Sequence, residues 1–95
     1  MKIYARTLFN GDFILEEIDA SEIQGFKDCA IAHVGKRWIV YDIPTGLLIV
    51  YGNTRKEAME KLNEKKLQME QARKTQLYQK RIKEFEEMKK ICLKV

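Results

Sequence analysis

The stretch KIYARTLFNGDFILEEID, residues 2–19, decides how the chain begins to fold. Apolar and polar residues alternate on both sides of Asn10-Gly11. Asn-Gly between two alternating runs is the strongest short hairpin signal, because both turn residues tolerate a positive φ. The stretch therefore predicts an antiparallel hairpin with strands at residues 2–9 and 12–19.

Three further strands are predicted after this hairpin. Gly35 opens a two-residue turn, as a type II′ hairpin requires, and the chain reverses again from Pro44 to Gly46. Residues 20–27 lack clean alternation and include a glycine, so they are expected to be a connector. The predicted strands are residues 28–34, 37–43 and 47–51.

The rest of the chain is predicted to be one long helix. Thr54 and Glu57 have the spacing of a capping box, and no Gly or Pro follows them. Helix-forming residues dominate from there to about residue 92. The fold class is therefore α+β in one domain, residues 1–95. An antiparallel β-meander of about five strands fills residues 1–53, and a long basic helix fills residues 54–95.

This helix carries two apolar stripes about 130° apart, so one straight helix cannot bury both against one surface. Either it breaks near residue 75 and turns back, or the second stripe packs on another chain. Sharp kinks usually need Gly or Pro, so a continuous projecting rod is the favoured expectation. The first stripe is Ala58, Leu62, Met69 and Ala72. The second is Leu77, Tyr78, Ile82, Phe85, Met88 and Cys92, of which Tyr78, Ile82, Phe85 and Met88 form a predicted face for a second copy or a partner helix.

The sequence offers few groups for catalysis. It has one histidine, His33, and two separated cysteines, Cys29 and Cys92. No further Cys or His lies near enough to complete a four-ligand zinc site, and the glycines are isolated turn residues rather than a phosphate-binding loop. We therefore expect a protein that is not an enzyme, with no catalytic residues, no metal and no cofactor.

The chain shows no run of about 18 apolar residues and no leader pattern at Met1. Its two cysteines do not have the spacing of a disulfide framework. The expected location is the cytosol of a host cell, with reduced thiols and no membrane contact.

Basic charge is concentrated in the second half of the chain. The net charge is +4, yet residues 1–53 carry five basic and seven acidic groups, whereas residues 54–95 carry thirteen and seven. On a continuous helix, residues seven apart share one side, which could contact phosphates or an acidic protein surface. A solvated face that serves only solubility is the alternative. The predicted partner-binding cations are Lys66, Arg73, Lys80 and Lys83.

Trp38 and Tyr41 belong to a predicted strand, residues 37–43, that is apolar on both faces. A strand with one wet face would alternate with polar residues. Either residues 12–27 fold over the second face, or Trp38 or Tyr41 lies in a partner or dimer surface, where aromatic residues are enriched.

Several segments resemble small proteins of Gram-positive phages and mobile elements: WIVYD at residues 38–42, Thr45-Gly46, and GNTRKEA at residues 52–58. The resemblance implies compact, non-catalytic proteins that bind and block a host component, including anti-CRISPR and other anti-defence inhibitors. Many inhibitors of nucleic-acid-guided nucleases are acidic proteins that mimic a nucleic-acid duplex. A basic chain is instead expected to bind an acidic protein patch or the nucleic acid of a ribonucleoprotein.

The pattern Gly-x-Thr-x-x-Glu-Ala at residues 52–58 is also similar to the strand-to-helix junction of HicB-like antitoxin domains. Those domains rest on a three-stranded sheet with a Pro-x-x-Pro-Gly loop, which Pro44-Thr45-Gly46 matches only in part.

The predicted function is a phage-encoded binding protein that acts stoichiometrically on a host protein or ribonucleoprotein, for example as an anti-CRISPR-type inhibitor. A nucleic-acid-binding regulator that uses the basic helix is the alternative. A structural homodimer is the third hypothesis.

Overall fold

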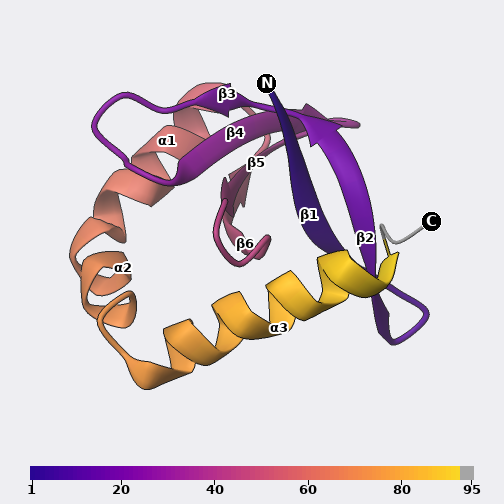
Figure 1. Cartoon of the computed structure of the whole chain (residues 1–95). Helices are drawn as coiled ribbons and strands as arrows, with labels where there is room; N and C mark the ends of the chain where they lie inside the picture. The colour runs from indigo at the N-terminus through magenta and orange to yellow at the C-terminus, as the bar shows by residue number, and fades with distance from the viewer. Residues whose placement is uncertain (93–95) are drawn as a thin grey trace.

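A computed structural model describes residues 1–92 of the chain (Figure 1). The fold is α+β, with six strands in two antiparallel sheets and three helices. The elements in chain order are β1 (Lys2–Phe9), β2 (Asp12–Asp19), β3 (Ser21–Glu22), β4 (Cys29–Val34), β5 (Arg37–Asp42), β6 (Leu48–Gly52), α1 (Arg55–Glu64), α2 (Lys66–Ala72) and α3 (Gln76–Cys92).

The predicted N-terminal hairpin is confirmed. β1 and β2 pair in register, with Leu8 opposite Phe13, and form a sheet of their own. Asn10 and Gly11 have φ values of 49° and 86°, as a type I′ turn requires. The local turn signal therefore fixed this part of the fold correctly.

The second sheet differs in detail from the predicted meander. Its strand order is β3-β4-β5-β6, and β3 lies where a connector was expected. Ser21 pairs with Ile31 of β4. A strand of two residues is too short to show alternation in the sequence, which explains why it was missed. The hairpin and this sheet together replace the single meander of about five strands.

The favoured continuous rod is wrong, and the alternative of a break near residue 75 is what the structure shows. The helical region is interrupted at Lys65, with φ −94° and ψ 1°, and again at residues 73–75. Thr75 caps α3, because its Oγ1 accepts a hydrogen bond from the N–H of Tyr78 at 3.2 Å. After this corner α3 runs back beneath the sheet toward the β1–β2 hairpin (Figure 1). Folding back lets each apolar stripe bury part of its length in the same chain, as the buried Leu62 and Phe85 show, whereas Leu77 and Cys92 stay exposed.

Each face of the four-stranded sheet has its own apolar core. On one face α1 buries Ala58 and Leu62 against Val40 and its neighbours. The predicted capping box holds α1 at this place, because the N–H of Glu57 donates to Thr54 Oγ1 at 3.1 Å. α1 therefore covers part of this face of the sheet, where Ile49 and Met69 remain partly exposed.

The opposite face is covered by the N-terminal hairpin. Ile3 and Ala5 of β1 pack there with Ala20 against Tyr41, which is only 6% exposed. The cover was expected from residues 12–27, but β1 supplies much of it because the hairpin folds across the sheet as a unit. Within residues 1–92, no helix has the combination of length and apolar character that crossing a membrane requires.

Candidate functional site

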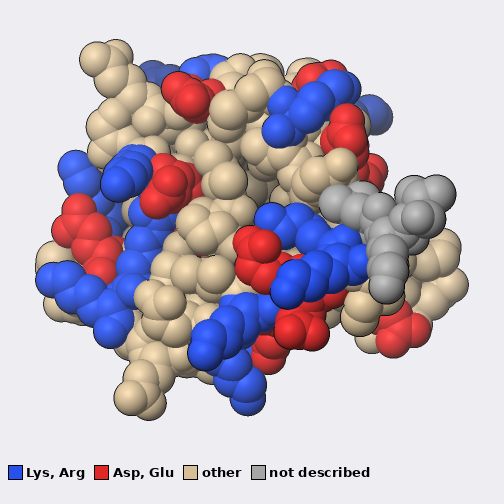
Figure 2. All heavy atoms as spheres, in the orientation of Figure 1, with Lys and Arg blue, Asp and Glu red and all other residues tan. Residues whose placement is uncertain are grey.

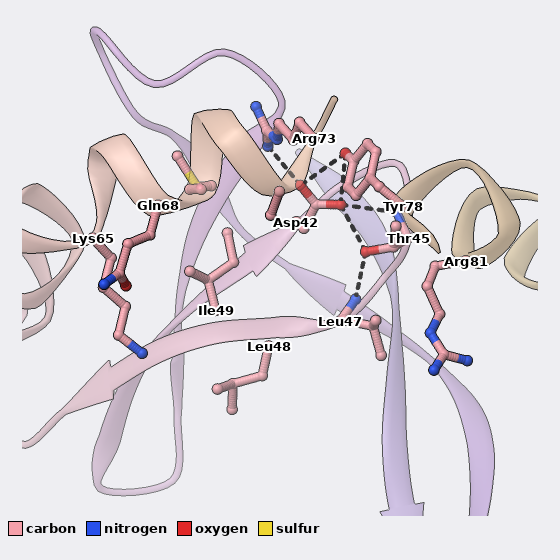
Figure 3. A pocket seen from close by; sticks show the side chains of 12 residues that line it. Asp42, Thr45, Leu47, Leu48, Ile49, Lys65, Gln68, Arg73, Tyr78 and Arg81 are labelled. Carbon is pink, nitrogen blue, oxygen red and sulfur yellow. Dashed lines mark hydrogen bonds and ion pairs between the residues drawn. The ribbon is translucent and has the colours of Figure 1, made fainter. Parts of the chain in front are cut away.

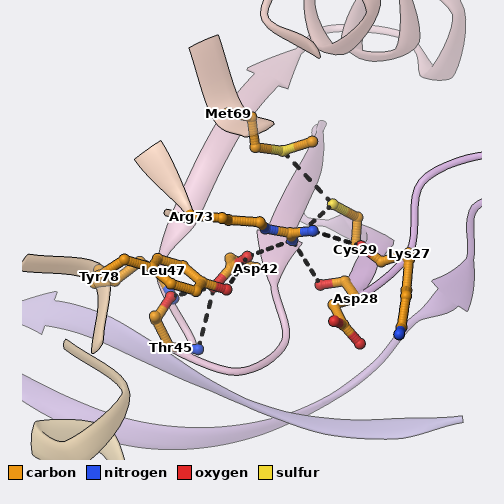
Figure 4. Close-up of polar contacts among 9 residues, drawn as sticks. All are labelled: Lys27, Asp28, Cys29, Asp42, Thr45, Leu47, Met69, Arg73 and Tyr78. Carbon is orange, nitrogen blue, oxygen red and sulfur yellow. Dashed lines mark hydrogen bonds and ion pairs between the residues drawn. The ribbon is translucent and has the colours of Figure 1, made fainter. Parts of the chain in front are cut away.

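A buried carboxylate, Asp42 at the end of β5, connects the sheet to the α2–α3 corner (Figure 4). Its Oδ1 accepts a hydrogen bond from Nη2 of Arg73 at 2.5 Å. Its Oδ2 accepts from the hydroxyl of Thr45 at 2.6 Å and from the N–H of Thr45 at 3.2 Å. The hydroxyl of Tyr78 donates to the same carboxylate at 3.0 Å. Arg73 therefore balances the charge of Asp42, and three neutral donor groups also bond to this carboxylate.

This network holds the two helices on either side of the corner, α2 before it and α3 after it. Arg73 also donates to the backbone carbonyls of Lys27 at 2.7 Å and Asp28 at 3.3 Å, so it ties α2 to the loop before β4. Burial, together with the charge and hydrogen bond of Asp42, raises the pKa of the Tyr78 hydroxyl. The phenol consequently stays protonated and remains a donor. Burial likewise raises the pKa of the Cys29 thiol, which Arg73 opposes only in part.

These contacts correct the predicted role of Arg73. The sequence predicts it as a free partner-binding cation with Lys66, Lys80 and Lys83, but its side chain is partly buried and pairs with Asp42. The other three are exposed, Lys66 on α2 and the other two on α3. The corner at residues 73–75 separates them, so they do not form the single row that a continuous helix would give.

The predicted dimer or partner face also lies largely inside the chain. Phe85 is 2% exposed and packs beneath the Gly46 turn, and Tyr78 is bound to Asp42. Ile82 and Met88 are half-buried. The chain reversal at residues 73–75 explains this burial as well, because it turns part of the second apolar stripe toward the sheet.

The two predicted aromatic contact residues differ in their surroundings. Tyr41 is buried under the hairpin, with 6% of its surface exposed. Trp38 is half-buried and stacks on exposed His33, with ring centroids 4.4 Å apart and planes 2° apart. Trp38 is therefore the one member of this pair that a partner can reach.

A cleft of about 310 Å³ opens beside the Asp42 network (Figure 3). β6 and the turn before it supply an apolar floor, and one wall comes from α2 while Arg81 of α3 stands on the other side. The floor residue Leu48 is 47% exposed. This volume is at the lower end of the range for ligand-binding clefts. The lining residues are Asp42, Thr45, Leu47, Leu48, Ile49, Lys65, Gln68, Met69, Ala72, Arg73, Tyr78 and Arg81.

The rim of this cleft is basic. Lys65 lies on one side and has no ion-pair partner within residues 1–92. Arg81, on the other side, pairs with Glu84 at 2.9 Å, and that carboxylate is also 3.7 Å from Arg6. The one carboxylate that lines the cleft, Asp42, is already satisfied by its four donors. Figure 2 shows Lys and Arg atoms, with Asp and Glu atoms among them, on both sides of a strip of uncharged atoms. The cleft is therefore suited to an apolar group that carries negative charge beside it.

The residues described offer little for metal chemistry. Within residues 1–92 no group of three or more His, Cys, Asp or Glu side chains is placed to hold a metal ion.

Comparison of the chain with protein-family models, with curated proteins and with solved structures found no match.

Sequence reasoning missed most of this cleft. A local signal existed for Asp42, because Asp at the first position of a turn accepts from the following backbone, as it does here from Thr45. Lys65 and Arg81 are sixteen residues apart in the sequence and line the same cleft only because the chain reverses at residues 73–75. No local pattern indicates that juxtaposition.

Proposed function

We propose that this chain is a non-catalytic binding protein that captures an acidic, apolar segment of another protein in the cleft between α2, β6 and α3. One observation carries the proposal: an open apolar floor at Leu48 lies between the cations Lys65 and Arg81. An apolar anchor gains free energy by leaving water, at about 25 cal/mol per Å² buried. The flanking cations orient the partner and speed its association.

A protein partner fits these residues better than naked nucleic acid. The predicted row of cations is divided between two helices, and Arg73 is bound to Asp42. An apolar floor provides neither base-stacking rings nor phosphate-binding donors. The alternative of a nucleic-acid-binding regulator therefore loses the feature on which it depended, although the exposed lysines allow it to be tested directly.

The resemblance to phage and mobile-element proteins agrees with this mode of action. An anti-CRISPR-type inhibitor acts by occupying a surface of a host protein or nucleoprotein, and a cleft that binds a segment would suffice for that.

A comparative capture experiment tests the proposal. The immobilised protein is incubated with a bacterial lysate, and recovered proteins are quantified by mass spectrometry. The cleft variant Lys65→Gln/Arg81→Gln is compared with a control, Lys36→Gln/Lys56→Gln, that loses the same charge at exposed positions outside the cleft.

We expect at least one protein to be recovered by the wild type and the control, and about tenfold less by the cleft variant, since two lost charge contacts of about 0.7 kcal/mol each give that factor. Equal recovery by both variants, or recovery of nucleic acid in place of protein, would contradict the proposal. Matching melting temperatures for the three proteins ensure that folding does not explain the result.

A further inference from the structure

The outer edge of β6 lacks a neighbouring strand. β6 is the last strand in the order β3-β4-β5-β6, and it pairs only with β5. Within residues 1–92, the ammonium group of Lys61 donates to the carbonyl of Tyr51 at 3.0 Å, and no other strand pairs with β6. An unpaired strand edge is a template for another extended chain.

A bulge interrupts the regular pairing of β6 with β5 beside the cleft. The pairing register shifts by one residue between Val40 and Tyr41, so that Ile49 is an extra residue on β6. The extra residue of a bulge has no opposite residue on the partner strand, and the bulged strand bends there. The bend therefore coincides with Ile49, which lines the cleft floor.

A second cavity lies on the other face of the same strand. It has a volume of about 460 Å³ and is bounded by the hairpin residues Leu8 and Phe13, by Val34 and by Leu48. Leu48 also lines the first cleft, so the two cavities meet at the start of β6. Leu8 and Phe13 are 64% and 52% exposed, which leaves large apolar surfaces without a cover.

We propose that the partner segment is an extended strand that pairs with the outer edge of β6. Successive side chains of a strand point to opposite faces, so an added strand would place alternate apolar side chains in the two cavities. Its carboxylates would lie beside Lys65 and Arg81. This inference rests on the proposed function and adds the conformation and sequence pattern of the partner.

A second copy of the chain fits this edge less well. Antiparallel pairing of two β6 strands about a two-fold axis would bring Lys61 and Lys65 of one copy to the same side of the joined sheet as those of the other. Like charges so placed oppose association, and lysines beside an edge commonly prevent such self-pairing. The same lysines attract a strand that carries carboxylates.

Peptide selection followed by backbone methylation tests the inference. Peptides are selected on the wild-type protein from a randomised ten-residue library displayed on phage, and the tightest is synthesised. Each residue in turn is N-methylated, which removes one backbone N–H. The affinity of each peptide is measured for the wild type, for Lys65→Gln/Arg81→Gln and for the control Lys36→Gln/Lys56→Gln.

Strand addition predicts apolar residues at every second position, carboxylates among them, and a loss of about tenfold on methylation at alternate residues only. Hydrogen exchange at the amides of Ile49 or Tyr51 should slow when the peptide binds. If the cleft variant weakens binding but methylation has no period of two, strand addition is overturned and cleft binding stands. If no selected peptide distinguishes the cleft variant from the control, or if the wild type forms β6-paired dimers instead, both proposals fail.

Discussion

Arg73→Met is the substitution that most directly tests how the α2–α3 corner is held. The change keeps much of the side chain's apolar length but removes the cation that pairs with Asp42 at 2.5 Å. It also removes hydrogen bonds to the carbonyls of Lys27 and Asp28. Asp42 would then be a buried carboxylate that retains only neutral donors, those of Thr45 and Tyr78.

The cost follows from the burial of the two partners. Breaking a fully buried ion pair costs about 3–5 kcal/mol, whereas an exposed pair contributes about 0–1 kcal/mol. The Asp42 side chain is 7% exposed and that of Arg73 is 21% exposed. With neutral donors still in place, we expect a loss of about 2–3 kcal/mol in the free energy of unfolding. For a chain of this size that lowers the melting temperature by about 10–20 °C.

Urea unfolding followed by circular dichroism measures this loss. Lys74→Met is the matched control, because Lys74 is exposed and adjacent, and we expect it to change stability by less than about 0.5 kcal/mol. A double-mutant cycle with Asp42→Asn should show coupling of about 1–2 kcal/mol between the two positions. Strict additivity, or a stability of Arg73→Met within about 0.5 kcal/mol of the wild type, would refute this account of the corner.

Two further substitutions test the packing beneath the Gly46 turn and the protonation of Tyr78. Gly46→Ala should destabilise the protein by about 2–4 kcal/mol in the same unfolding assay. The reason is that φ is +69° at Gly46 and that a Cβ there would lie 2.5 Å from the buried ring of Phe85. A Gly46→Ala variant as stable as the wild type would contradict that packing. Because the Tyr78 pKa is raised in the folded state, the unfolded chain loses its phenol proton first as pH rises, so this group's contribution to stability falls from about pH 10 upward. Tyr78→Phe should therefore flatten the loss of stability between about pH 9.5 and 11 in thermal melts, and an unchanged alkaline slope would show that the phenol is not held by Asp42.

Elements with local signals were predictable. Asn10-Gly11 specified the first hairpin and Thr54 with Glu57 specified the start of α1, because both devices act within four residues. The corner before α3 also had a local signal, the capping residue Thr75, which the prediction did not use, and the absence of Gly and Pro favoured a continuous helix. A capping threonine can mark the end of one helix and the start of another without Gly or Pro.

The candidate site was less predictable, because its parts come from distant segments. Tyr78 meets Asp42 across 36 positions of sequence, and Arg6 of β1 donates to the carbonyls of Thr45 and Arg81. Such contacts depend on the direction in which α3 returns, which no periodicity encodes. An error at that one corner therefore changed the predicted roles of Arg73, Tyr78 and Phe85.

The dissociation constant of a captured protein partner, measured for the wild type and the two charge variants at one salt concentration, tests the central claim most directly. We predict that Lys65→Gln/Arg81→Gln weakens binding by about tenfold, while Lys36→Gln/Lys56→Gln changes it by less than about twofold. Equal weakening by the two variants would contradict a specific cleft. Tight binding of naked duplex DNA, with a steep salt dependence and the same affinity for both variants, would identify a nucleic-acid-binding protein instead.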